Sequence, residues 1–166
     1  SYERAVQEDP SIIWYYINQV NILLDMGRRE EALKVIEQTI EVSPNNATVW
    51  ARRGQVLRRL EDYQEAVNSY ARALEHQKDY AWAWNGKGLC HAALGQWDQA
   101  LHCYLEAVKY DDSDVWFWHN AGESHLNLGE YAKAVEMFEK ALSINAKHQP
   151  TNDKIRTARE LRDKDG

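Results

Sequence analysis

Apolar positions along this chain follow the period of an amphipathic α-helix and are interrupted at regular points by glycine. In a representative stretch, one helical face carries Trp84, Gly88, His91 and Leu94, and we expect a second helix to come close at the glycine. Gly95 then breaks the pattern, and a glycine at such a position ends a helix at little cost. A second apolar stripe follows at helical spacing and consists of Trp97, Ala100, Leu101, Tyr104, Ala107 and Val108. The pattern predicts two antiparallel helices joined by a tight turn, neither of which can bury its stripe alone.

This pair of helices recurs every 34 residues. Trp50, Trp84 and Trp118 keep that interval, and each is followed four residues later by a glycine. Three further series keep it as well: Ala32, Ala66, Ala100 and Ala134; Ile36, Tyr70, Tyr104 and Phe138; and Thr39, Ala73, Ala107 and Ala141. A fixed period of this length indicates an array of one supersecondary unit, in which each pair of helices packs on the next.

The order of tryptophan, glycine, aromatic and alanine positions within the period resembles the tetratricopeptide repeat. The resemblance covers residues 13–148 and implies an all-α fold, a right-handed superhelical solenoid of helix-turn-helix repeats. The chain departs from the family pattern at several positions: Tyr16 replaces tryptophan, Val20 replaces glycine, Glu61 replaces the turn glycine, and Arg53 and Lys87 replace leucine. The two long cationic side chains must lay their stems along the packed surface.

The register of the repeat predicts how the chain is divided. We expect residues 1–12 to be the remnant of the second helix of a preceding repeat, and 149–166 to be a C-terminal capping helix. Four complete repeats are expected between them, at residues 13–46, 47–80, 81–114 and 115–148. Ala5 and Pro10 lie one period before Thr39 and Pro44, and the sequence does not begin with methionine. We therefore expect the chain to be a piece of a longer repeat array.

The amino-acid composition of the chain indicates which classes of partner are not expected. The chain is 44% hydrophobic and 28% charged, with a formal net charge of −6. It carries no apolar run of the length needed to span a bilayer, so no membrane partner is expected. Related helical repeats read RNA base by base. Nucleic acid is nevertheless not expected as a partner, because the clustered Lys and Arg that it demands are missing.

Cysteine and histidine neighbours raise the question of a metal or redox site. Cys90 and His91 are adjacent, as are His102 and Cys103. Neighbouring residues on a helix point about 100° apart, so neither pair is suited to hold one ion. We expect small buried thiols and no metal or cofactor, with a Cys90–Cys103 disulfide left open. A glycine-rich run at 85–88 lies inside a helix and lacks the strand of a phosphate loop, so no enzymatic activity is expected.

A second tryptophan series is a candidate for binding. The resemblance implies that the first helix of each repeat lines the concave side of the superhelix. Trp14, Trp82 and Trp116 lie two residues before the core aromatic position, about 200° away around the helix. We expect them to point toward the concave groove, where exposed tryptophan favours binding. The alternative is that each stacks on its own chain, for instance against Tyr80.

Polar residues on the same predicted face indicate which hydrogen-bonding and charged groups the groove would offer to a partner. Those expected to line it are Asn18, Asn21, Arg52, Gln55, Arg59, Asn85, His119 and Asn120. Asparagine offers a donor and an acceptor to the backbone of an extended peptide. The arginines are candidates for contacting an acidic group of the partner.

One binding mode of the family can be tested on the sequence. The carboxylate clamp for acidic chaperone C-termini needs Lys and Asn, then Asn, then Lys and Arg on three successive first helices. Here the matching residues are Ile17 and Asn21, then Arg52, then Trp82 and Gly86, so only Asn21 fits. A clamp of that type is not expected.

The sequence thus predicts a non-catalytic protein–protein interaction scaffold that binds a partner peptide or helix in its concave groove. The alternative is a structural or regulatory repeat arm of a larger protein, packing on its own domains. Self-association is a third possibility, because Ile12, Ile13 and Tyr16 would lack the preceding repeat that should cover them.

Overall fold

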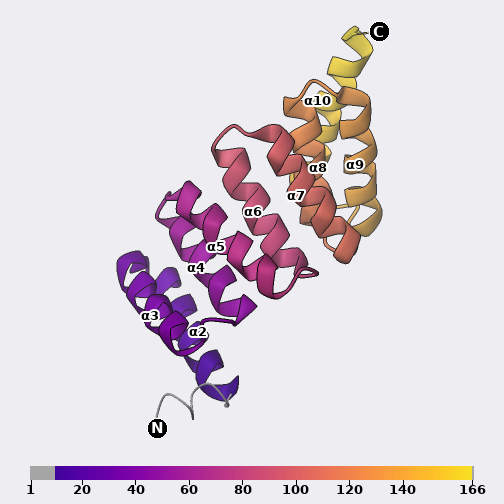
Figure 1. Cartoon of the computed structure of the whole chain (residues 1–166). Coiled ribbons are helices and arrows are strands. Elements are labelled where there is room, and N and C mark those ends of the chain that lie inside the picture. The colour runs from indigo at the N-terminus through magenta and orange to yellow at the C-terminus, as the bar shows by residue number, and fades with distance from the viewer. Residues whose placement is uncertain (1–9, 166) are drawn as a thin grey trace. The chain divides into compact units, whose positions relative to one another are not determined.

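The computed structural model describes residues 10–165, and all regular secondary structure in that part of the chain is helical (Figure 1). The first helices of the repeats are α2 (Pro10–Asp25), α4 (Ala47–Arg59), α6 (Ala81–Ala93) and α8 (Val115–Asn127). The second helices are α3 (Arg29–Val42), α5 (Tyr63–His76), α7 (Trp97–Tyr110) and α9 (Tyr131–Ile144), and α10 (Gln149–Asp165) follows them. The predicted all-α fold is confirmed.

The chain divides into two compact units, residues 1–79 and residues 80–166. In the first unit, α3 packs on α2 and on α4, and α4 packs on α5. In the second unit, each of the helices from α6 to α10 packs on the next one along the chain. Every helix therefore buries its apolar stripe against sequence neighbours, as an array of repeats requires.

The helix boundaries follow local chemistry. Side chains that accept a backbone N–H bond begin three of the helices, namely Asn46, Asp62 and Asp114. Each such cap satisfies a donor that the helix itself leaves unpaired. Residues with a positive φ of 73–76° follow three first helices, and all are glycines: Gly27, Gly95 and Gly129. Glu61 stands at the equivalent turn with a φ of 64°, a conformation that disfavours a side chain.

The glycines inside the first helices mark the closest approach of the two helices of a repeat. A Cβ atom added at Gly88 would lie 2.6 Å from the Tyr104 ring, and one at Gly122 would lie 2.6 Å from the Phe138 ring. Real Cβ atoms essentially never come so close to another heavy atom. The sequence-based expectation that a second helix comes close at these glycines is therefore confirmed.

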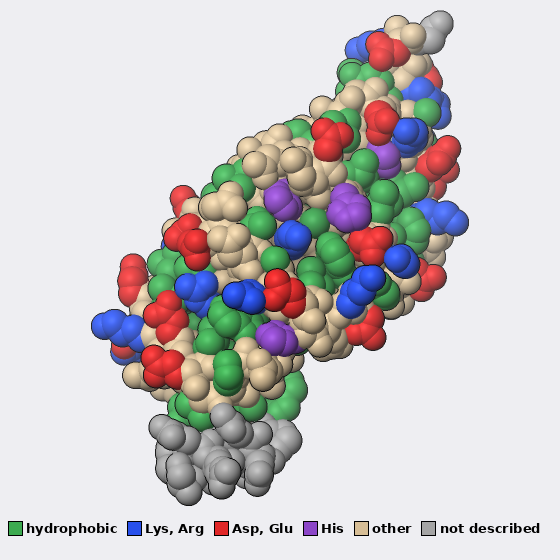
Figure 2. Space-filling view, viewed as in Figure 1, with side chains coloured by type: hydrophobic (Ala, Val, Ile, Leu, Met, Phe, Trp, Pro, Cys, Tyr) green, Lys and Arg blue, Asp and Glu red, His purple; other side chains and the backbone are tan. Residues whose placement is uncertain are grey.

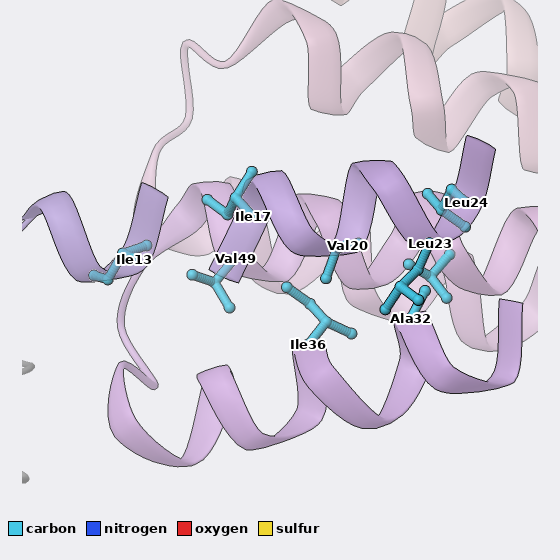
Figure 3. Packing of buried hydrophobic residues seen from close by; sticks show 9 residues of the cluster. Ile13, Ile17, Val20, Leu23, Leu24, Ala32, Ile36 and Val49 are labelled. Carbon is cyan, nitrogen blue, oxygen red and sulfur yellow. The ribbon is translucent and has the colours of Figure 1, made fainter. Parts of the chain in front are cut away.

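The first repeat reaches the same close packing with a different pair of residues. Val20 stands where the other repeats have glycine, and Ile36 stands where they have an aromatic ring. Both are fully buried in one core cluster and face each other between α2 and α3 (Figure 3). A larger residue on one helix is thus accompanied by a smaller one on the other, which keeps the interior close-packed.

Two predictions about the packing need correction. Residues Pro10 to Ile12, assigned from the sequence to a preceding helix, belong to α2, and proline suits the first turn of a helix. The rest of that predicted segment lies outside the described residues. The tryptophan series at 50, 84 and 118 is half-buried rather than enclosed in the core. The residue just before it is the more deeply buried one, Val49 in the second repeat and Phe117 in the fourth.

The half-buried tryptophans are held by a polar bond as well as by packing. The indole N–H of Trp50 donates to the backbone carbonyl oxygen of Pro44 at 2.7 Å. The indole N–H of Trp118 donates to the backbone carbonyl oxygen of Asp112 at 2.9 Å. In each case the acceptor lies six residues earlier, in the turn that enters the helix. Each ring therefore fastens the turn between two repeats, which explains why a residue with an N–H is placed there.

Candidate partner-binding surface

The three tryptophans predicted to face the groove do not share one environment. Trp14 on α2 is 55% exposed and Trp116 on α8 is 48% exposed. Trp82 on α6 is half-buried, and its ring centre lies 6.0 Å from that of Tyr80. The alternative of packing on the chain itself therefore describes Trp82 best, whereas Trp14 and Trp116 offer ring surface to solvent.

Trp116 rests on a set of side chains that we call the Trp116 platform, consisting of His119, His148 and Thr151. The Trp116 ring meets His148 edge-on at 4.5 Å and His119 at 5.3 Å between ring centres. Nδ1 of His119 and Nδ1 of His148 lie 2.9 Å and 2.6 Å from the Thr151 hydroxyl oxygen. The platform joins α8 to the start of α10, so the exposed ring is held from beneath by two elements.

Two residues predicted to line the groove are instead buried. His119 is only 4% exposed and lies against the other two members of the Trp116 platform and against Phe138. Asn120 is also buried and donates from Nδ2 to Oδ1 of Asn85 on α6 at 2.9 Å. His119 is covered because α8 and α10 contact each other, and Asn120 is covered where it bonds to Asn85 on α6. Neither residue is exposed for direct contact with a partner.

The first unit places its candidate residues around α2 and α4. Nη1 of Arg52 donates to Oε1 of Gln55 at 2.9 Å, and both side chains are half-buried, while Arg59 is exposed. On α2, Asn18 is exposed and Asn21 is half-buried. Trp14 lines a cavity of about 330 Å³, together with Ile13, Ile17, Ser43, Asn45, Asn46 and Thr48. A hollow beside an exposed indole is a feature that the periodicity of the sequence could not reveal.

A larger cavity, of about 640 Å³, lies in the same unit on the side of the second helices. It is lined by Glu37, Ile40, Trp50, Arg53, Glu65, Asn68, Ser69, Ala71, Arg72 and Glu75. Nη1 of Arg53 donates to the Ser69 hydroxyl at 2.7 Å, and its Nη2 lies 3.5 Å from a Glu37 carboxylate oxygen. The arginine that replaces the usual leucine is thus bonded within the chain, and acidic and basic side chains are interspersed on the face shown in Figure 2.

The cysteines are buried thiols and do not form a reactive site. Cys90 and Cys103 are both buried, and neither forms a disulfide in the described part of the chain. Burial raises the pKa of the Cys103 thiol to about 11, which keeps it protonated and unreactive. Within residues 10–165, no three His, Cys, Asp or Glu side chains are grouped so that they could hold a metal ion.

The chain was also compared with known proteins. The tetratricopeptide repeat family matches residues 11–79, 45–113 and 79–147, so the chain belongs to that family. No curated protein matches the sequence. None of the described helices is long and apolar enough to cross a membrane.

Solved structures with the same fold have low sequence identity. MamA from Desulfovibrio magneticus RS-1 is 22% identical, with 92% of each chain covered and a TM-score of 0.76. PilF of Pseudomonas aeruginosa is 20% identical over 98% of this chain and 76% of its own, with a TM-score of 0.82. The first repeat domain of Spaghetti (RPAP3), bound to the HSP90 peptide SRMEEVD, is 16% identical over 69% of this chain and 91% of its own, with a TM-score of 0.68. At these identities the likeness shows the fold alone.

Proposed function

We propose that this protein binds an extended segment or a helix of a partner protein on the surface of its first helices, with Trp116 as the main anchor. The observation that carries the proposal is an indole that is half exposed yet held from beneath by buried side chains. Tryptophan is enriched at binding hot spots because it offers a large, rigid contact area. A ring already fixed in place loses little conformational entropy when a partner covers it.

The first unit supports the same function with different chemistry. Trp14 and the hollow beside it can receive an apolar side chain, whereas Arg59 and the Arg52–Gln55 pair can contact an acidic group. The RPAP3 domain of the same fold binds a peptide with two adjacent glutamates. We therefore propose a peptide with an acidic group as the class of partner. The carboxylate clamp would not hold this peptide, because only Asn21 matches the residues that the clamp needs.

The proposal can be tested by affinity capture from a lysate of the source organism with quantitative mass spectrometry. The test variant is Trp82→Ala with Trp116→Ala. The matched control is Leu105→Ala with Ile144→Ala, because these residues are 40% and 42% exposed on the second helices α7 and α9. Helical circular dichroism and a cooperative melt establish that both variants are folded.

We expect the native protein and the control to retain a common partner that the tryptophan variant loses. Equal capture by all three proteins would contradict the proposal and would favour a structural arm that uses another surface. Loss by the control alone would place the binding site on the second helices.

A second candidate function is self-association through α2. Of the residues that the sequence predicted to lie uncovered, Ile13 is buried and Ile12 and Tyr16 are half-buried, but other side chains of this helix are exposed and favour this function. Tyr15 and Ile22 are exposed along one side of this helix, and Met26 is exposed in the turn just after it. The residues one period later than the first two, Val49 and Val56, are fully buried. The exposed stripe is apolar and uncharged, so it can pair with its own copy across a two-fold axis without like-charge repulsion.

Sedimentation velocity over a range of protein concentrations tests this second candidate. The native protein should form a dimer as the concentration rises, and Ile22→Asp should remain monomeric because it places a charge in the interface. Leu105→Asp adds the same charge on α7 and should dimerise like the native protein. A native protein that remains monomeric at high concentration would rule out self-association.

A further inference from the structure

Two buried histidines share one hydroxyl group at the joint between α8 and α10. His119 and His148 are 4% and 9% exposed, and their ring centres lie 5.6 Å apart. Both Nδ1 atoms are within hydrogen-bond distance of the Thr151 hydroxyl, which is itself fully buried. Besides this cluster, α10 is tied to the preceding repeat by the Lys154–Glu123 and Arg159–Glu139 ion pairs and by Ile155 and Ala158, which share a core cluster with Phe138. The histidine cluster is a buried polar part of this joint.

The bonding requires at least one of the two rings to donate its Nδ1 proton to the Thr151 oxygen. A hydroxyl has one proton, so Thr151 can donate to only one ring, and the other ring must donate to the oxygen. Nε2 of His148 is buried and has no hydrogen-bond partner among the described residues. An unpaired acceptor is better tolerated in a protein interior than an unpaired N–H. We therefore assign the donor role to Nδ1 of His148, and Thr151 donates to Nδ1 of His119.

Protonation of either ring conflicts with this arrangement. A proton on His148 goes to Nε2, where a buried N–H would have no acceptor among the described residues. A proton on His119 goes to Nδ1, so the Thr151 hydroxyl would have to turn its own proton away and accept from both rings. If both rings were protonated, two positive charges would lie 5.6 Å apart in a buried site.

The surrounding groups do not compensate for such charges. From α8, Glu123 faces the site, but its carboxylate already pairs with Lys154 of α10 at 2.6 Å. From α9, the contact is the uncharged ring of Phe138, 5.7 Å from His119 between ring centres. Burial lowers the pKa of His119 below its ordinary 6.5; Glu123 opposes this shift, whereas His148 and Lys154 add to it.

We infer that the pair of histidines is an acid-sensitive latch, which when neutral fastens α10 to α8 beneath Trp116 and when protonated releases α10 and abolishes partner binding. The binding part of this inference rests on the proposed function of Trp116. Because the folded pKa of His119 is lowered, its stabilisation is fully present above pH 6.5 and is lost as the pH falls through the folded value. We therefore expect α10 to be released at mildly acidic pH, below 6.5.

Hydrogen exchange tests the latch without a partner. Amide protection of α10 is measured at pH 7.5 and 5.5, corrected for intrinsic exchange, and compared with that of α9. We expect protection of α10 in the native protein to fall by about tenfold, because pH 5.5 lies one unit below the ordinary pKa of 6.5 that a histidine has once it is released. Protection of α9 should change much less. Equal change in the two helices, or no change in α10, would overturn the latch.

Two variants assign the effect to these residues. His119→Gln with His148→Gln keeps groups that can bond to Thr151 but cannot titrate, so the pH dependence of α10 should disappear. His102→Gln removes an exposed histidine on α7 and should leave that dependence unchanged. If the double variant fails to fold, Thr151→Val serves instead: with the hydroxyl gone, protection of α10 should already be reduced at pH 7.5. Protection of α10 that Thr151→Val leaves unchanged at pH 7.5 would overturn the latch.

Capture at the two pH values tests the coupling to binding. The native protein should lose its partner between pH 7.5 and pH 5.5, whereas the amount that the double glutamine variant captures, whatever its level at pH 7.5, should not change between the two pH values. Native capture that persists at pH 5.5 while α10 is released would overturn the coupling. If Trp116→Ala captured the partner as well as the native protein does, the proposed function would fail while the exchange result for α10 stood on its own.

Discussion

Single residues decide how closely the two helices of a repeat approach. Gly88 lies against the Tyr104 ring, and Gly122 lies against Phe138. In the first repeat, Val20 is larger than the glycine of the other repeats and Ile36 is smaller than their aromatic ring, so the pair fills the same space. The departure from the family pattern at Val20 is therefore a paired change, in which the residue on the facing helix is smaller.

Gly88→Ala tests this close approach. The added methyl group would lie 2.6 Å from the Tyr104 ring. Overpacking of this kind costs about 2 kcal/mol, and replacing glycine within a helix gains no more than about 1 kcal/mol. Urea unfolding should therefore show a net loss of about 1 kcal/mol.

A double-mutant cycle with Tyr104→Leu separates the clash from other effects. The smaller side chain makes room for the methyl group, so the double variant should lose less stability than the sum of the two single losses. Strictly additive losses, or a Gly88→Ala protein more stable than the native one, would show that the ring does not restrict the glycine.

At the scale of elements, the turn between α4 and α5 differs from the other turns that link the two helices of a repeat. Glu61 adopts a φ of 64° where Gly27, Gly95 and Gly129 occupy equivalent positions. A residue with a side chain is less stable than glycine in this conformation by about 1 kcal/mol. Glu61→Gly should therefore raise the free energy of unfolding by about that amount.

The reverse exchange provides the control for this turn. Gly95→Glu places a side chain at a φ of 73° and should lower the melting temperature, whereas Glu61→Gly should raise it. Thermal unfolding followed by circular dichroism measures both. A decrease in both variants would mean that contacts of the Glu61 side chain outweigh the strain of its backbone.

The elements themselves could be predicted from the sequence because every helix repeats one pattern of apolar, small and turn residues. The glycine at each close approach was predictable for the same reason. The burial of His119 and Asn120 was not, because it depends on how closely α8 lies to α10 and to α6. A helical wheel gives the direction of a side chain but not what lies opposite it. The half-burial of Trp82 beside Tyr80 has the same cause.

At the scale of the whole molecule, each compact unit offers a different candidate surface. The first unit has an indole beside a hollow and arginines near it, and the second has an indole on a buried polar platform. The second carries the proposed anchor because the Trp116 platform fixes the ring, whereas Trp14 borders an open cavity. The joint with α10 then makes binding at Trp116 sensitive to the state of two histidines.

The most direct test of the proposed function is the affinity of the captured, purified partner for Trp116→Ala, measured by isothermal titration calorimetry at pH 7.5. A hot-spot tryptophan contributes at least about 2 kcal/mol, so the dissociation constant should rise roughly 30-fold. Trp116→Phe should recover part of that loss, and Ile144→Ala on α9 should bind like the native protein. A folded Trp116→Ala protein that binds within twofold of the native affinity would contradict the claim that this ring anchors the partner.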